Sequence, residues 1–191
     1  MKYNYCGIIL AKQHSERLPN KNFLKIKEVK ETKSTITGKP IELSSCDLVR
    51  NTLCFSGVET FLFIEKPVTF INHGHYHRPP AASLDNEPLF SALKWAYKSL
   101  PKRYDAIINI MANAPLFTSE DVKKAIQKFE ELGVEELRSF DSNGKESGLM
   151  IVKEKYLLEK HEVSTYQGGI ILDNIEIHTQ EDFDRCKELL S

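Results

Sequence analysis

The chain has 191 residues, of which 41% are hydrophobic and 28% charged, and its formal net charge is −1. This length suits one domain, residues 1–191, with a proper buried core, and the composition is that of an ordinary globular protein. The near-zero net charge argues against a general affinity for nucleic acid or a membrane surface. Any anion site must therefore be a local cluster of basic residues.

The sequence shows no sign of secretion or membrane anchoring. The apolar run at Tyr5–Ala11 is too short for a signal sequence. No stretch approaches the roughly 18 apolar residues that a membrane span needs. The four cysteines are scattered without a C-x-x-C pair, which favours reduced thiols. We therefore expect a cytoplasmic protein.

Apolar runs and helical periodicities alternate along the chain, and continuous apolar runs are typical of strands buried on both faces. In chain order, the patterns predict a strand at Tyr5–Ala11, an exposed insertion or hairpin at 27–37, a helix at Ile41–Phe55, a strand at Glu59–Ile64, a helix at Leu89–Leu100, a strand at Ala106–Met111, a helix at Thr118–Leu132, strands at Gly148–Val152 and Gly169–Leu172, and a helix at Thr179–Leu190. Capping pairs mark the starts of the last two helices, where Thr118 precedes Asp121 and Thr179 precedes Asp182.

Strands that alternate with helices predict an α/β fold, with three layers (α/β/α) and a mostly parallel sheet. In such sheets ligands bind at the carboxyl ends of the strands. The loops that follow strands are therefore the places where functional residues are expected.

The loop after the first predicted strand is rich in basic residues. It contains Lys12, Arg17 and Lys21, and cations at the carboxyl end of a strand can neutralise a triphosphate. A solvated basic loop explains the same composition equally well. The residue types alone leave both interpretations open.

Five segments occur in an order that is similar to a known family. They are AKQHSERLPNKN at 11–22, GKPI at 38–41, RPPAASLD at 78–85, ANAPL at 112–116 and IEIHTQEDF at 175–183. Together they resemble the CMP-sugar synthetases (acylneuraminate cytidylyltransferases and their relatives), whose triphosphate loop runs A-R-G-G-S-K-R-L-P-G-K-N. The resemblance implies the nucleotide-diphospho-sugar transferase fold. It also implies a reaction in which CTP and an acidic sugar such as sialic acid form a CMP-sugar and release pyrophosphate.

The resemblance also implies roles for individual residues. Nucleotide-binding positions are Ala11, Lys12, Ser15, Arg17, Lys21, Asn22, Arg78, Asp85 and Asn113. Of these, Lys12 and Lys21 would neutralise phosphate charge and Arg78 would stabilise charge in the transition state, which makes these residues the expected catalytic groups. Glu176 and His178 fall at the metal positions, which implies Mg²⁺ or Mn²⁺. The family also makes a homodimer possible.

The sequence departs from the family at several of these positions. Gln13 and His14 replace a glycine pair whose backbone N–H groups approach phosphate closely, and Glu16 replaces a lysine. His178 is a poor ligand for Mg²⁺, which prefers carboxylate oxygens. In the family, the segment that selects the sugar follows a strand to which Glu136–Phe140 corresponds, and in this chain that segment is reduced to 141–147. The acceptor site is then missing, or the insertion at 27–37 or another chain supplies it.

These departures support a second hypothesis beside the enzyme. A catalytically degenerate homologue would bind a nucleotide or scaffold a partner in sugar modification without turning CTP over. A third possibility is an enzyme that uses UTP or another nucleotide on the same fold, since a fold does not determine a function.

Overall fold

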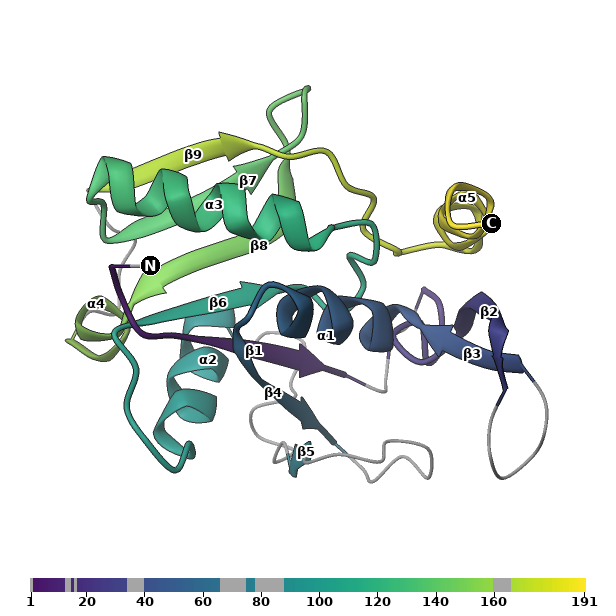
Figure 1. The fold of residues 1–191 in the computed structure, drawn as a ribbon, viewed down its shortest axis with the longest axis horizontal. Coiled ribbons are helices and arrows are strands. Elements are labelled where there is room, and N and C mark those ends of the chain that lie inside the picture. Colours follow the sequence, from purple (N-terminus) through teal and green to yellow (C-terminus); the bar gives the residue numbers. More distant parts are fainter. Residues whose placement is uncertain are drawn as a thin grey trace.

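The computed structural model describes residues 2–12, 15, 17–33, 40–65, 75–77, 88–159 and 166–191. They form an α/β sandwich around a seven-stranded sheet of order β5-β4-β1-β6-β8-β7-β9 (Figure 1). Its strands are β1 (Tyr5–Ala11), β4 (Glu59–Ile64), β5 (His75–His77), β6 (Ala106–Ile110), β7 (Glu136–Phe140), β8 (Glu146–Lys153) and β9 (Gln167–Ile171). All strands run parallel to β1 except β8, which is antiparallel to its neighbours β6 and β7. The predicted, mostly parallel α/β sheet is confirmed.

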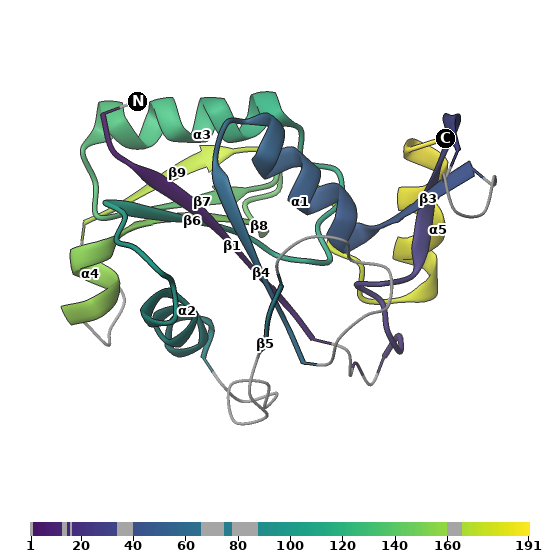
Figure 2. The same ribbon diagram turned by 60° about the horizontal axis from the view of Figure 1, so that its bottom comes forward.

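Helices cover both faces of this sheet, as Figure 2 shows. They are α1 (Ser45–Phe55), α2 (Leu89–Lys98), α3 (Ser119–Leu132), α4 (Glu154–Glu159) and α5 (Gln180–Leu189). Helices α1 and α3 pack on one face, where Ile9 of β1 belongs to their core cluster. Helices α2 and α4 pack on the other face with Ile8. Successive residues of β1 thus point into opposite cores, which explains its uninterrupted apolar run.

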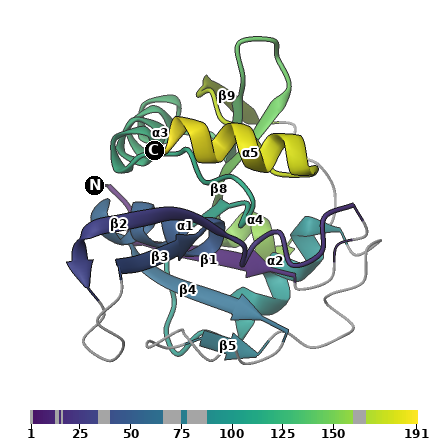
Figure 3. The ribbon, with the colours of Figure 1, turned by 90° about the vertical axis from the view of Figure 1, so that its right-hand side faces the viewer.

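A small second sheet and α5 lie beyond the carboxyl ends of β1 and β6 in Figure 1, and they face the viewer in Figure 3. Strands β2 (Lys25–Lys33) and β3 (Pro40–Ser44) pair antiparallel. Ile26 of β2 packs against Phe183 and Cys186 of α5, together with Leu18 and Ile177. This third core cluster anchors the loop after β1 against the C-terminal helix.

The predicted helix at Ile41–Phe55 is wrong in its first residues. Ile41–Ser44 belongs to β3, where Ile41 pairs with Val29. Ser44 is the N-cap of α1, and its side chain accepts a hydrogen bond from the backbone N–H of Asp47. The hairpin expected at 27–37 is confirmed, because β2 and β3 form an antiparallel pair. Residues 34–39, which connect the two strands, lie outside the described residues. The other predicted helices are confirmed, and the sequence patterns missed β5 and α4.

In the described residues, no helix is long and apolar enough to cross a membrane.

The N-cap of α3 provides a stability test of the local structure. Thr118 Oγ1 accepts a hydrogen bond from the Asp121 N–H (3.2 Å), and Asp121 Oδ2 accepts one from the Thr118 N–H (2.9 Å). We expect Thr118→Ala to lower the free energy of unfolding by about 1 kcal/mol, because helix N–H groups lose their partner. Urea denaturation measures this change. Thr118→Ser keeps the hydroxyl and should behave like the wild type; equal losses in both variants would contradict the capping explanation.

Candidate active site

The loops that follow β1 and β6 meet the segment before α5 at the carboxyl edge of the sheet. Asn113, which follows β6, is buried, and its amide Nδ2 donates to the carbonyl oxygen of Ile177 (3.1 Å). The Ile177 N–H donates in return to the carbonyl oxygen of Asn113 (2.8 Å). This reciprocal pair joins two segments that are distant in sequence. Asn113 therefore holds Glu176 and His178 in place, since they flank Ile177.

Basic residues of the first loop converge on His178. Its Nδ1 lies 3.1 Å from Nη2 of Arg17 and 3.4 Å from Nζ of Lys21. Its Nε2 lies 2.9 Å from Oε2 of Glu176. Nδ1 thus faces two N–H donors, an arrangement that favours the tautomer with its proton on Nε2, from which it can be donated to Glu176. The structure thus brings the predicted loop cations and the predicted metal positions together.

Lys21 lies half-buried in this cluster. Burial and the neighbouring charge of Arg17 hold the pKa of Lys21 below its ordinary value, although the carboxylates of Glu176 and Asp182 favour the charged ammonium. A bound polyanion would relieve the repulsion between the two cations. The cluster is therefore well suited to receive phosphate groups.

Asn22 is the last residue of the basic loop, and one atom of its side-chain amide lacks a hydrogen-bond partner in the described structure. Its side chain is buried, and Nδ2 donates to the carbonyl oxygen of Lys12 (2.9 Å). Its Oδ1 finds no hydrogen-bond partner among the described residues. A buried acceptor left unpaired is costly, so such an atom commonly meets a donor on a ligand or an ordered water. Asn22 is thus a buried amide at the end of the basic loop whose oxygen can still accept a hydrogen bond.

The remaining predicted site residues are only partly visible. Ala11 is buried at the end of β1, and Lys12 and Ser15 follow it with intermediate exposure. Arg78 and Asp85 lie outside the described residues, as do Gln13, His14 and Glu16. The structure therefore groups Arg17, Lys21, Glu176 and His178 directly and does not test the positions of Arg78 and Asp85.

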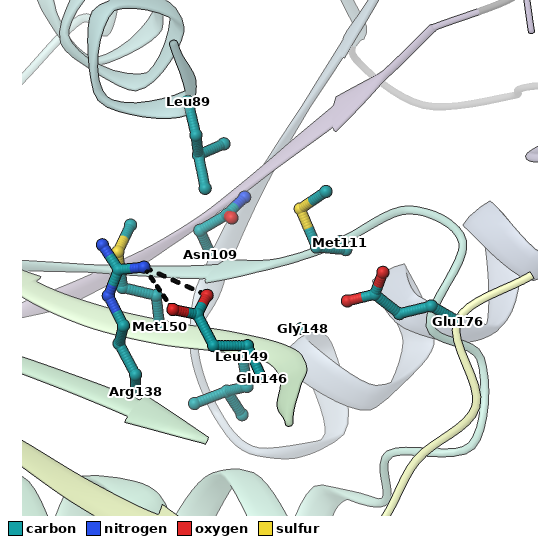
Figure 4. A pocket seen from close by; sticks show the side chains of 9 residues that line it. All are labelled: Leu89, Asn109, Met111, Arg138, Glu146, Gly148, Leu149, Met150 and Glu176. Atoms are coloured by element: carbon teal, nitrogen blue, oxygen red, sulfur yellow. Dashed lines mark hydrogen bonds and ion pairs between the residues drawn. The ribbon is translucent and has the colours of Figure 1, made fainter. Parts of the chain in front are cut away.

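Glu176 also lines a pocket beside this cluster (Figure 4). The free space in and in front of this pocket is about 430 Å³, open solvent included, and the pocket is lined by Leu89, Asn109, Met111, Arg138, Glu146, Gly148, Leu149, Met150 and Glu176. Gly148 has a φ of +98°, and a Cβ there would lie 3.0 Å from Oε1 of Glu176. The glycine thus leaves room for the carboxylate. Glu176 stands between the two parts of the site, with Oε2 on His178 and Oε1 at the pocket.

The sequence patterns did not predict this pocket. Glu136 and Arg138 did carry a signal, because charged residues two positions apart share one face of a strand that otherwise reads as buried. Glu146 had no such signal, since it lies at the start of β8, beside a turn, where charged residues are common.

Comparisons with known proteins give matches at the level of structure. No protein-family model and no curated protein matches the chain. CMP:2-keto-3-deoxy-manno-octonic acid synthetase complexed with CTP has a TM-score of 0.73 at 14% identity, over 98% of this chain and 98% of that chain. A cytidylyltransferase from Leptospira borgpetersenii serovar Hardjo-bovis has a TM-score of 0.65 at 15% identity, over 96% and 85%. The chain has the nucleotide-diphospho-sugar transferase fold.

A metal-containing structure shares this fold. Rv0371c from Mycobacterium tuberculosis H37Rv, in complex with manganese, has a TM-score of 0.64 at 11% identity, over 97% of this chain and 98% of that chain. At such identities the likeness establishes the fold. The resemblance to CMP-sugar synthetases is thus confirmed in architecture, and the reaction has to be argued from the residues of the site.

Proposed function

We propose that the protein is a cytidylyltransferase that transfers CMP from CTP to a hydroxyl group of a sugar. The observation that carries the proposal is the convergence of Arg17 and Lys21 on the Glu176–His178 pair at the carboxyl edge of the sheet. The acceptor oxygen forms a bond to the α-phosphorus, and the bond from that phosphorus to the bridging oxygen breaks. Pyrophosphate leaves with that oxygen. The resemblance makes an acidic sugar the first acceptor class to test.

The loop cations would hold the triphosphate. Arg17 and Lys21 can each donate charge-assisted hydrogen bonds to the β- and γ-phosphates, and Lys12 precedes them on the same loop. Fixed positive charges of this kind stabilise the charge that develops on the leaving pyrophosphate. The resemblance adds Arg78 for the α-phosphate. Asn22 Oδ1 would accept a hydrogen bond from a hydroxyl or amino group of the nucleoside, which satisfies its unpaired oxygen.

Glu176 would act on the acceptor. Its Oε1 is directed at the pocket while Oε2 accepts from His178. A carboxylate in this position can accept the proton of an acceptor hydroxyl as that hydroxyl attacks. His178 keeps the carboxylate oriented through its Nε2–H. The pair therefore stands where the nucleotide and the acceptor would meet.

A divalent metal fits these residues only with help from the nucleotide. Among the described residues, no group of three or more His, Cys, Asp or Glu side chains could hold a metal ion. Mg²⁺ is, however, often bound by one or two carboxylates together with substrate phosphates. Glu176 offers an oxygen, and Nδ1 of His178 would offer its lone pair once Arg17 and Lys21 turn from it to the triphosphate. A set of one oxygen and one nitrogen suits Mn²⁺ better than Mg²⁺. We infer that both residues would hold the ion jointly with the triphosphate, whose negative charge it would reduce.

The metal preference provides a prediction. His178→Asp replaces a nitrogen ligand by a carboxylate oxygen, so we expect the Mg²⁺ concentration for half-maximal stabilisation of the CTP complex to fall about tenfold or more. Thermal unfolding with CTP, titrated separately with Mg²⁺ and Mn²⁺, measures this. His178→Asn is the matched control without added charge. Equal Mg²⁺ affinity in the wild type and His178→Asp would show that position 178 does not face the ion.

The proposed reaction is tested by pyrophosphate release. The assay combines the protein, CTP, Mg²⁺ or Mn²⁺ and a panel of acidic and neutral sugars, with ATP, GTP and UTP as comparison nucleotides. We expect turnover with CTP and at least one sugar. If folded protein shows no turnover while CTP still raises its melting temperature, the nucleotide-binding homologue is the better description. If neither occurs, both descriptions fail.

A further inference from the structure

The pocket beside Glu176 has an unusual charge arrangement centred on Arg138. The Arg138 Nε donates to Oε1 of Glu136, whose side chain is 0% exposed. The other oxygen of Glu136 accepts from Nε2 of Gln167 (3.2 Å). Arg138 therefore forms an ion pair with a carboxylate that is fully buried and has no access to water.

Arg138 is also held from the solvent side. Its Nη1 donates to both oxygens of Glu146, at 2.8 and 3.0 Å, as the dashed lines in Figure 4 show. The Glu146 side chain is 58% exposed at the pocket rim. The single positive charge of Arg138 is thus shared between two carboxylates. Within the described part of the chain, Nη2 donates no hydrogen bond, so it is available as a donor to a bound molecule.

The pocket as a whole is consequently acidic. Among its lining residues, Arg138 is the cation, and Glu146 and Glu176 are carboxylates. Glu136 adds a further buried negative charge directly behind Arg138. An acceptor that carries a carboxylate would have to displace Glu146 from Arg138 or bring another negative charge beside Glu176. Both are unfavourable, because an intramolecular partner competes at high effective concentration and like charges repel.

The other lining groups suit an uncharged polyol. Glu146 and Glu176 can accept hydrogen bonds from hydroxyl groups, and Arg138 Nη2 can donate one to a hydroxyl or ring oxygen. Leu89, Met111 and Met150 offer apolar surface for the C–H face of a sugar ring. A pocket that combines apolar walls with a few placed polar groups is typical of small-molecule sites.

We propose that this pocket is the acceptor site and that it selects uncharged, polyhydroxylated acceptors, with Glu146 as the residue that excludes acidic sugars. This inference rests on the proposed function, since it concerns the acceptor of that reaction. It replaces the acidic acceptor that the resemblance implies by one that matches the charges present here.

The test uses a matched pair of acceptors. The acidic probe is 2-keto-3-deoxy-manno-octonic acid, and the neutral probe is the same sugar with its carboxylate converted to the primary amide. Affinity for each is measured by calorimetry on the full chain in the presence of CMP, and turnover by pyrophosphate release with CTP. For the wild type we expect the amide to be favoured at least tenfold in affinity. For Glu146→Gln we expect the affinity for the acidic probe to rise about tenfold. Arg138 then no longer pairs with a carboxylate at position 146 and can pair with the carboxylate of the probe.

The control variant is Glu131→Gln, an exposed carboxylate at the far end of α3. It changes the net charge by the same amount and should leave the preference unaltered. A wild type that favours the acidic probe, or that binds neither probe, overturns the inference. Binding of the amide without pyrophosphate release supports the assigned pocket and its selectivity but overturns the proposed transfer reaction. The two failures are therefore distinguishable.

Discussion

Lys21→Met is expected to lower kcat/KM for CTP by about a hundredfold to a thousandfold, the usual cost of losing one preorganised group that stabilises transition-state charge. Lys21 is half-buried beside Arg17 and His178, so a cation from the solvent does not readily replace the positive charge that the variant lacks. Initial rates of pyrophosphate release measure the effect. The matched control is Lys25→Met, because the Lys25 ammonium lies 3.8 Å from Asp47 instead. Comparable losses in both variants would indicate a general charge effect.

The pH profile adds a second measure of the same residue. Burial and Arg17 lower the pKa of Lys21 in the free enzyme, and the charged form is the one that binds phosphate. Because kcat/KM reports ionisations of the free enzyme, it should fall on the alkaline side at a pH below that of an ordinary lysine. In Lys21→Arg this fall should disappear, since the guanidinium stays protonated. An unchanged profile would assign the fall to another group.

Arg138→Met is expected to lower the free energy of unfolding by about 3 to 5 kcal/mol. The reason is the buried carboxylate of Glu136, whose charged partner is Arg138 and whose other hydrogen bond comes from Gln167. Removing the arginine leaves this charge in the protein interior without compensation. Urea denaturation at neutral pH measures the loss.

Two further variants test this explanation. The double variant Glu136→Gln with Arg138→Met should recover most of the lost stability, because no unpaired charge remains buried. Glu146→Gln should cost less than about 1 kcal/mol, since its ion pair is largely exposed. If the double variant is as unstable as Arg138→Met alone, lost packing of the arginine side chain is the cause, and the buried charge is not.

Local patterns predicted most of the elements. The apolar run at Tyr5–Ala11 predicted β1, because a strand buried on both faces needs apolar residues throughout. Thr118 and Asp121 predicted the start of α3, since a capping box involves residues three positions apart. The boundary at Ile41–Ser44 was wrong because so short an apolar stretch fits a strand or a helix, and its pairing partner β2 decides between them.

The sequence by itself determined the buried strands β1, β4 and β6, the caps of α3 and α5 and the basic loop that holds Arg17 and Lys21, because these depend on neighbours along the chain. Only the tertiary structure decided that His178 meets both cations, across sequence separations of 161 and 157 residues. It also decided that Arg138 and Glu146 line one pocket with Glu176, and that Arg138 pairs with the buried Glu136. The physical reason is strand order: β1, β6, β8 and β7 lie side by side, and the edge where their loops meet exists only after the sheet has assembled.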